Sequence, residues 1–385
     1  MSSFDNDIPG ILATLRSEAD PNLSPLFYTF EDLYQRKLWH QLTESLDIFY
    51  KNPLSNKIKL RLYNNFISNF KTNINQLKLV QFLLLSINNL ENSNESLEYL
   101  TSLQKDLESQ DNVDKEQALI FINIEIARLN LRLGKEIEAR EFLDDITSKL
   151  DKFDSIDLKI NQSFFSTNSE YFKIKSDYNN FYYQSLLYLS TLQINEDLTL
   201  VEQQKLAYEL SISALLADKI YNFGELLTHP ILKTLENGSY QWIIELLYAL
   251  NSGSINSFSK ILVNLEKVPI LKNSESFLRQ KICLMTLVEL VFSKSIRTIT
   301  FEEVSKVTYL QIDEVEHLVM RALSLGLLKG SIDQINQSIS INWVQPRIIN
   351  KEQIENMKQR LINWDENVVK LGKFMETNGK EIWIQ

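Results

Sequence analysis

Apolar residues recur every three or four positions over most of this chain, which is the spacing of helices that bury one face. Between about residues 24 and 293 such segments follow one another, separated by short polar breaks. One pair is clear: Gly134 ends a first helix, and Ala139 is small enough to let a second helix approach closely. Another pair turns at residues 175–177. Such pairs stack in tetratricopeptide-like solenoids, so we predict an α-solenoid of degenerate repeats over residues 1–270.

The pattern changes further along the chain. Residues 312–323 have one apolar face and stop near Gly326, where a left-handed turn favours glycine. Two short alternating runs follow, at residues 328–332 and 338–343, with a polar wing tip between them. We expect the second run to bury three residues: Ile339, Ile341 and Trp343. A helix followed by two such strands is the layout of a winged helix, which we predict for residues 271–348.

The start of this predicted domain has its own signals. Residues 275–293 are almost wholly apolar and should form a buried helix, and residues 297–301 should form a short first strand. Thr300 and Glu303 have the spacing of a capping box, which predicts that the next helix begins there. We expect that helix to point three residues inward: Phe301, Val304 and Val307.

The last part of the chain carries a heptad pattern. Seven apolar residues lie alternately three and four positions apart: Ile354, Met357, Leu361, Trp364, Val368, Leu371 and Met375. They predict a helix over about residues 351–377, roughly 40 Å long, in a C-terminal region of residues 349–385. Because an exposed apolar row of this kind is costly, we expect it to contact helices of partner proteins. The alternative is that it packs on the solenoid of its own chain.

Composition narrows the class of protein. The chain of 385 residues has only 9 Gly and 7 Pro, which argues for long helices and against a turn-rich sheet fold. Its net charge of −10 disfavours non-specific attraction to nucleic acid or to anionic membranes. The single cysteine, Cys283, cannot form an internal disulfide and fits a reducing compartment. We therefore expect a mostly α, soluble, intracellular protein without a membrane-spanning segment.

The chain shows no catalytic or metal-binding signature. The three histidines, His40, His229 and His317, lie far apart in the sequence, and Cys283 sits in an apolar helix as a core thiol would. No HExxH, GxxxxGK[ST], GxGxxG or GxSxG motif occurs. We predict no enzymatic activity, catalytic residue, cofactor or metal. A catalytic pair formed by residues of two distant helices would leave no such motif in the sequence.

A winged helix raises the alternative of nucleic-acid binding. The helix that would enter a groove carries Asp313, Glu314 and Glu316 near its start, and Arg321 is its only further charge. Three carboxylates would repel a phosphate backbone, where nucleic-acid readers place cations or amides. The aromatic residues between 164 and 183 could stack on RNA bases, but packing between helices is the preferred interpretation.

Helical repeats, an acidic winged helix and a long final helix are the plan of the PCI family. Residues 315–333, VEHLVMRALSLGLLKGSID, closely resemble the signature of that family. The winged helix alone would indicate only the PCI class, which signalosome and translation-initiation scaffolds share. Further resemblance, to PCI subunits of the 26S proteasome lid, lies in residues 12–27, 164–172, 211–231, 275–287 and 342–348.

The resemblance implies a non-catalytic scaffold subunit of the proteasome lid, which supports ubiquitin-dependent protein degradation in the cytoplasm and nucleus. In that family winged helices line up side by side and C-terminal helices gather into a bundle. The heptad residues are therefore implied to be one interface, and open strand edges of the wing another. The implied wing-strand residues are Ser338, Ile339, Ser340, Ile341, Asn342 and Trp343.

The same resemblance implies particular partners. They are a neighbouring PCI subunit, MPN-type subunits and a ubiquitin receptor, with neither nucleic acid nor membrane among them. The alternatives are an adaptor of the signalosome or of translation initiation, or an RNA-binding winged-helix protein.

Overall fold

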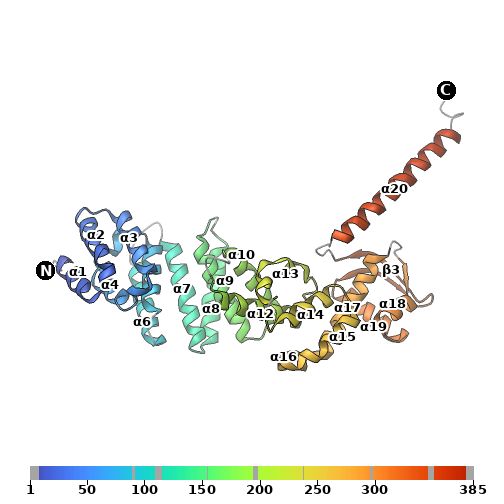
Figure 1. Cartoon of the computed structure of the whole chain (residues 1–385), viewed down its shortest axis with the longest axis horizontal. Helices are drawn as coiled ribbons and strands as arrows, with labels where there is room; N and C mark the ends of the chain where they lie inside the picture. Colours follow the sequence, from blue (N-terminus) through green and yellow to red (C-terminus); the bar gives the residue numbers. More distant parts are fainter. Residues whose placement is uncertain are drawn as a thin grey trace. The chain divides into compact units, whose positions relative to one another are not determined.

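The protein consists of two compact units, Met1–Gln193 and Ile194–Gln385. The computed structural model describes residues 8–88, 92–108, 115–153, 155–193, 198–236, 238–294, 298–345 and 351–378. Helices build the first unit, and the second adds a three-stranded sheet and a long last helix (Figure 1). The predicted fold class, helical repeats followed by a winged helix and a terminal helix, is confirmed. The predicted boundaries at residues 270 and 348 stay predictions.

The first unit is a succession of helices, coloured from blue to green in Figure 1. Its α-helices are α1 (Ile8–Glu18), α2 (Ser24–Gln35), α3 (Trp39–Lys51), α4 (Lys59–Asn65), α5 (Gln76–Ile87), α6 (Ser93–Glu108), α7 (Lys115–Arg132), α8 (Glu136–Leu150), α9 (Leu158–Ile174) and α10 (Tyr178–Thr191). Short 3-10 helices lie at Pro21–Leu23, Pro53–Ser55 and Ile67–Asn73.

Aromatic side chains hold the first helices of this unit together. Phe27 and Phe30 of α2 and Phe49 of α3 pack edge to face, with ring centroids 5.6 to 5.8 Å apart. All three rings are buried, and each contributes roughly 1.5–3 kcal/mol relative to an exposed position. The apolar faces of α2 and α3 are therefore fixed against each other.

Both predicted helix pairs are present. Gly134 has a φ of +78° and separates α7 from α8, and Ala139 is fully buried where α8 packs on α7. In the second pair Ser176 takes the left-handed conformation between α9 and α10, with a φ of +57°. Asp177 then caps α10, because its side chain accepts a hydrogen bond from the amide of Asn180.

The second unit begins with helices and ends with the sheet and the last helix. Its elements are α12 (Leu200–Leu216), α13 (Gly224–Thr228), α14 (Gln241–Asn251), α15 (Ile255–Ile261), α16 (Pro269–Asn273), α17 (Glu275–Ser293), β1 (Thr298–Thr300), α18 (Phe301–Thr308), α19 (Ile312–Ser324), β2 (Leu328–Asp333), β3 (Ser338–Val344) and α20 (Lys351–Asn378). Short 3-10 helices lie at Pro230–Leu235 and Leu262–Lys267.

The predicted apolar helix is α17, and it packs against α12, α14, α15, α16, α18 and α19. Its close approach to the turn after α14 depends on Gly253, which has a φ of +63°. A Cβ there would lie 2.9 Å from the Cα of Thr286, whose hydroxyl donates to the Gly253 carbonyl at 2.7 Å. The turn and the helix therefore meet backbone to backbone.

One buried lysine ties α17 to the end of α12. Lys281 is only 1% exposed, and its ammonium donates to the carbonyls of Ala214, Leu215 and Ala217 at 2.8, 3.1 and 2.8 Å. These carbonyls lie at a helix C-terminus, where no further helical amide can pair with them. Three aromatic rings stand within 5.1 to 5.6 Å of the same ammonium: Tyr221, Phe223 and Phe277.

The winged helix has the predicted layout. The sheet order is β1-β3-β2, both pairs are antiparallel, and α18 and α19 lie between β1 and β2 in the chain. Gly326 has the expected left-handed φ, +71°, after α19. Thr300 and Glu303 form the predicted capping box of α18. Of the predicted first strand, Arg297 lies outside the described residues.

Two inward positions were predicted wrongly. Val307 is 40% exposed, because α18 turns Phe301, Val304 and Thr308 toward the core, and Val307 lies off that face. Trp343 is also 40% exposed. An irregularity in the β2–β3 register between Lys329 and Gly330 interrupts the alternation in β3.

The reason for the Trp343 error is local. Ile341 pairs with Gly330 and Trp343 with Lys329, so Asn342 is an extra residue in β3. The extra residue reverses which of the following side chains of β3 face the core. Val344, opposite Leu328, is therefore more covered than Trp343. The Trp343 ring faces outward beneath the Lys329 ammonium, 4.8 Å from the ring centroid.

Candidate interaction surfaces

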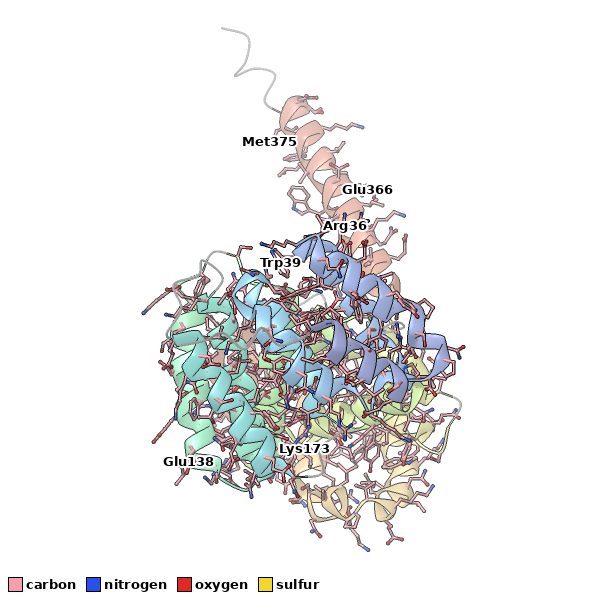
Figure 2. All side chains as sticks on the ribbon, turned by 90° about the vertical axis from the view of Figure 1, so that its left-hand side faces the viewer. Arg36, Trp39, Glu138, Lys173, Glu366 and Met375 are labelled. Carbon is pink, nitrogen blue, oxygen red and sulfur yellow. The ribbon has the colours of Figure 1, made fainter. Side chains whose placement is uncertain are left out.

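The predicted heptad helix is α20, and we call its seven apolar residues the seam: Ile354, Met357, Leu361, Trp364, Val368, Leu371 and Met375. Every seam side chain is exposed, among them Leu361 (66%) and Trp364 (65%). Figure 2 shows the side chains of α20 standing out around the ribbon, with Glu366 and Met375 labelled. An exposed apolar row of this length marks an interaction surface more often than a solvated one.

A second apolar row on α20 escaped the sequence analysis. Ile362 and Val369 lie seven residues apart, beside the seam, and both are exposed. Their spacing of seven residues is also a heptad pattern, but the sequence analysis considered only the row with the most apolar residues. Together the two rows make the apolar face wider than the two positions per heptad of a two-stranded coiled coil. A face of this width fits contact with more than one neighbouring helix.

The wing sheet offers its edges through β1 and β2. The predicted wing strand is β3, the central strand, and its residues Ser338–Ser340 pair with β1 on one side and β2 on the other. Backbone pairing with a neighbour along that stretch is therefore available to β1 and β2 and not to β3. An interface role for the side chains of Ser338–Trp343 stays a prediction.

Gly330 keeps β2 close to β3. A Cβ at this position would lie 2.2 Å from the Ser340 carbonyl oxygen and 3.1 Å from the Ile341 Cα. We expect Gly330→Ala to lower the free energy of unfolding by about 1–3 kcal/mol, because the strands must separate. Urea denaturation followed by circular dichroism measures this. Gly372→Ala, in open space on α20, is the control and should cost nothing. Equal midpoints for Gly330→Ala and wild type would contradict the expectation.

The start of α19 is acidic on its exposed side. Asp313 and Glu314 are exposed in its first turn, where carboxylates favour the helix dipole. Glu314 accepts from the amide of Gln311 at 3.3 Å, and Glu316 accepts from the Gln334 side chain at 3.2 Å. These carboxylates therefore stabilise local structure and leave a surface unsuited to a phosphate backbone.

The aromatic residues between 164 and 183 lie on α9 and α10, and Phe164, Phe165 and Tyr171 pack against the core that the preceding helices share. Phe164, Phe181 and Tyr182 are buried, whereas Tyr183 is exposed. Stacking on RNA needs several exposed rings side by side. The arrangement supports the packing interpretation.

The three histidines lie in different parts of the structure, and His317 lines the same hollow as Cys283, beside α17 and α19. His40 and His317 are exposed, and His229 accepts a hydrogen bond from the amide of Ile231 in a turn. Burial raises the pKa of the Cys283 thiol, which is partly covered on α17 and stays protonated at neutral pH. Within the described ranges no group of histidine, cysteine and carboxylate residues could hold a metal ion. Among the helices described, none has the length and apolarity to cross a membrane.

Helical repeats, an acidic winged helix and an exposed terminal helix together define a PCI-domain protein. The matching family models are PSD13 N-terminal repeats over residues 26–247, PCI domain over residues 260–343 and Rpn9 C-terminal helix over residues 347–379. The chain belongs to the PSD13/Rpn9 family of PCI-domain proteins.

Similar proteins extend over the whole chain. The 26S proteasome regulatory subunit RPN9 of Saccharomyces cerevisiae is 53% identical over 392 residues, which cover 99% of this chain and 100% of that protein. The probable 26S proteasome regulatory subunit rpn9 of Schizosaccharomyces pombe is 38% identical, covering 96% of each chain. Eukaryotic translation initiation factor 3 subunit M of Nematostella vectensis is 25% identical over only 33% of this chain. Full-length similarity thus favours the proteasome subunits over the initiation factor.

Proposed function

We propose that this chain is a non-catalytic scaffold subunit of the regulatory-particle lid of the 26S proteasome. The observation that carries the proposal is the 53% identity to a 26S proteasome regulatory subunit along the entire chain, α20 included. The structure is consistent with a scaffold, since it exposes an apolar helix seam and open strand edges. Its work would be to hold catalytic and receptor subunits in place for ubiquitin-dependent degradation, in the cytoplasm and nucleus.

Two surfaces would carry the assembly. The seam and the second row of α20 would enter a bundle with C-terminal helices of other lid subunits, because that buries apolar area now in water. The edges of β1 and β2, with the side chains of Ser338–Trp343, would contact the winged helix of a neighbouring PCI subunit. MPN-type subunits and a ubiquitin receptor would be further partners.

Affinity purification of the full-length protein, followed by mass spectrometry, tests the proposal. We expect the full chain to recover proteasome lid and ATPase subunits. A chain ending at Asn350 should stay folded, since the side chains described on α20 are exposed, but should lose those partners. Recovery of initiation-factor or signalosome subunits would overturn the proposed function. Full recovery by the truncated chain would overturn the role of α20.

A further inference from the structure

The seam of α20 has the layout of one strand of a two-stranded coiled coil. It runs through three full heptads, with Ile354, Leu361, Val368 and Met375 at a positions and Met357, Trp364 and Leu371 at d positions. β-Branched residues at a, such as Ile354 and Val368, and leucine at d favour a parallel dimer. Each side chain of α20 that the structure describes is exposed, so no described part of the chain covers this face.

The charged residues beside the seam indicate which helix fits it. In a parallel coiled coil each g position lies next to the e position five residues further along the other helix. Arg360 is at g and Asp365 at e, so two α20 helices in register bring Arg360 of each copy beside Asp365 of the other. The same register brings no like charges together at the other g and e positions between them: Gln353, Lys358, Asn367 and Gly372. The flanks of the seam are therefore complementary to themselves.

Both members of this charge pair are available to a second copy. Asp365 is exposed and has no ion pair with another described residue. The Nη2 atom of Arg360 donates to the carbonyls of the last two residues of α17, at 3.4 and 3.1 Å, and its Nη1 and Nε atoms can still donate to a carboxylate. An antiparallel pair would set Asp365 against Lys358 instead, but Lys358 already contacts Glu355 of its own helix at 2.9 Å.

We propose that the free protein forms a parallel homodimer in which the seams of two α20 helices face each other, flanked by two Arg360–Asp365 pairs. The inference rests on the proposed function, since it names what covers the seam before the chain joins the lid. Ile362 and Val369 are at b positions, which point away from the other helix of a two-stranded coil, and they stay in water. A bundle that covers both rows buries more apolar area, so it is favoured over the second copy. The homodimer is thus a reversible state of the unassembled subunit.

Sedimentation velocity of the full-length chain over a concentration series tests this inference. We expect the mass to rise with concentration from the 45.0 kDa of one chain toward twice that value. Arg360→Asp and Asp365→Arg each place like charges side by side in the dimer. Each single variant should raise the dissociation constant about tenfold, because two attractive pairs become repulsive.

Two further samples separate charge pairing from other effects of these substitutions. The double variant Arg360→Asp, Asp365→Arg restores opposite charges and should dimerise as the wild type does, although it also lacks the contact of Arg360 with α17. An equal mixture of the two single variants should form a heterodimer, because each then meets the opposite charge. Lys373→Asp is the matched control, since it makes the same charge change as Arg360→Asp at an exposed f position and should leave the dimer intact.

Several outcomes would overturn the inference. They are a wild-type chain that stays monomeric at every concentration, a dimer that Arg360→Asp does not weaken, a double variant that is not rescued, and an equal loss in Lys373→Asp. Recovery of proteasome subunits is a separate readout. A monomeric chain that still recovers them would overturn only the homodimer, and a dimeric chain that recovers none would overturn only the proposed function.

Discussion

A chain in which Leu361 and Trp364 are both replaced by Asp will unfold at the same urea concentration as the wild type but will not co-purify with proteasome subunits. Stability is unaffected because both side chains are already about two-thirds exposed on α20. Assembly is lost because the helix bundle would have to bury two unpaired carboxylates. We expect a cost of about 3 kcal/mol or more, which is over a hundredfold in affinity.

The control for this experiment changes the charge of α20 equally, away from the seam. Gln359→Asp with Asn363→Asp adds two carboxylates at exposed polar positions on the same helix. We expect this variant to retain its partners, since its new charges stay in water. Partner loss in both variants would show that added charge alone is disruptive, and partner retention in both would refute the role of the seam.

Lys281→Met is the substitution for which we expect the largest loss of stability. The change leaves three carbonyls at the end of α12 without their donor. Removing the buried ammonium relieves some desolvation, but the unpaired carbonyls cost more together. We expect the free energy of unfolding to fall by about 3 kcal/mol, measured by urea denaturation at pH 7. Gln280→Met, at the exposed neighbouring position, should change it little.

The same lysine should make stability depend on pH. Burial lowers the pKa of Lys281 to about 7, with Asp218 opposing the shift, whereas in the unfolded chain it is about 10.4. At pH values between these two pKa values, the unfolded chain binds one more proton at Lys281 than the folded chain does. The free energy of unfolding therefore rises with pH in this range, and it decreases again as the pH falls toward 7.

The pH experiment compares wild type with Lys281→Met between pH 7 and 9. The cost of the substitution should grow over this range by up to about 1.4 kcal/mol per pH unit, because the variant lacks the titrating group. A cost that is constant or shrinks as pH rises would contradict the assigned direction of the shift.

The periodic features of this protein could be predicted from its sequence. Helix periodicity indicated α17 and α20, and the special residues Gly134 and Gly326 marked helix ends. The capping box at Thr300 has the same local character. These signals work because each depends on residues within one or two turns of the same helix.

Contacts between distant segments could not be predicted in this way. The position of β3 between β1 and β2, the extra residue at Asn342 and the resulting exposure of Trp343 all depend on which strand pairs with which. Val307 is exposed because tertiary packing places Thr308, and not Val307, on the buried face of α18.

The sequence by itself determined the helical class, the winged-helix layout and the apolar seam of α20, because apolar spacing and turn residues encode them locally. Only the tertiary structure decided that Lys281 meets the end of α12, more than sixty residues away. The physical reason is that a buried polar group is defined by the partners that surround it, and packing alone brings those partners together.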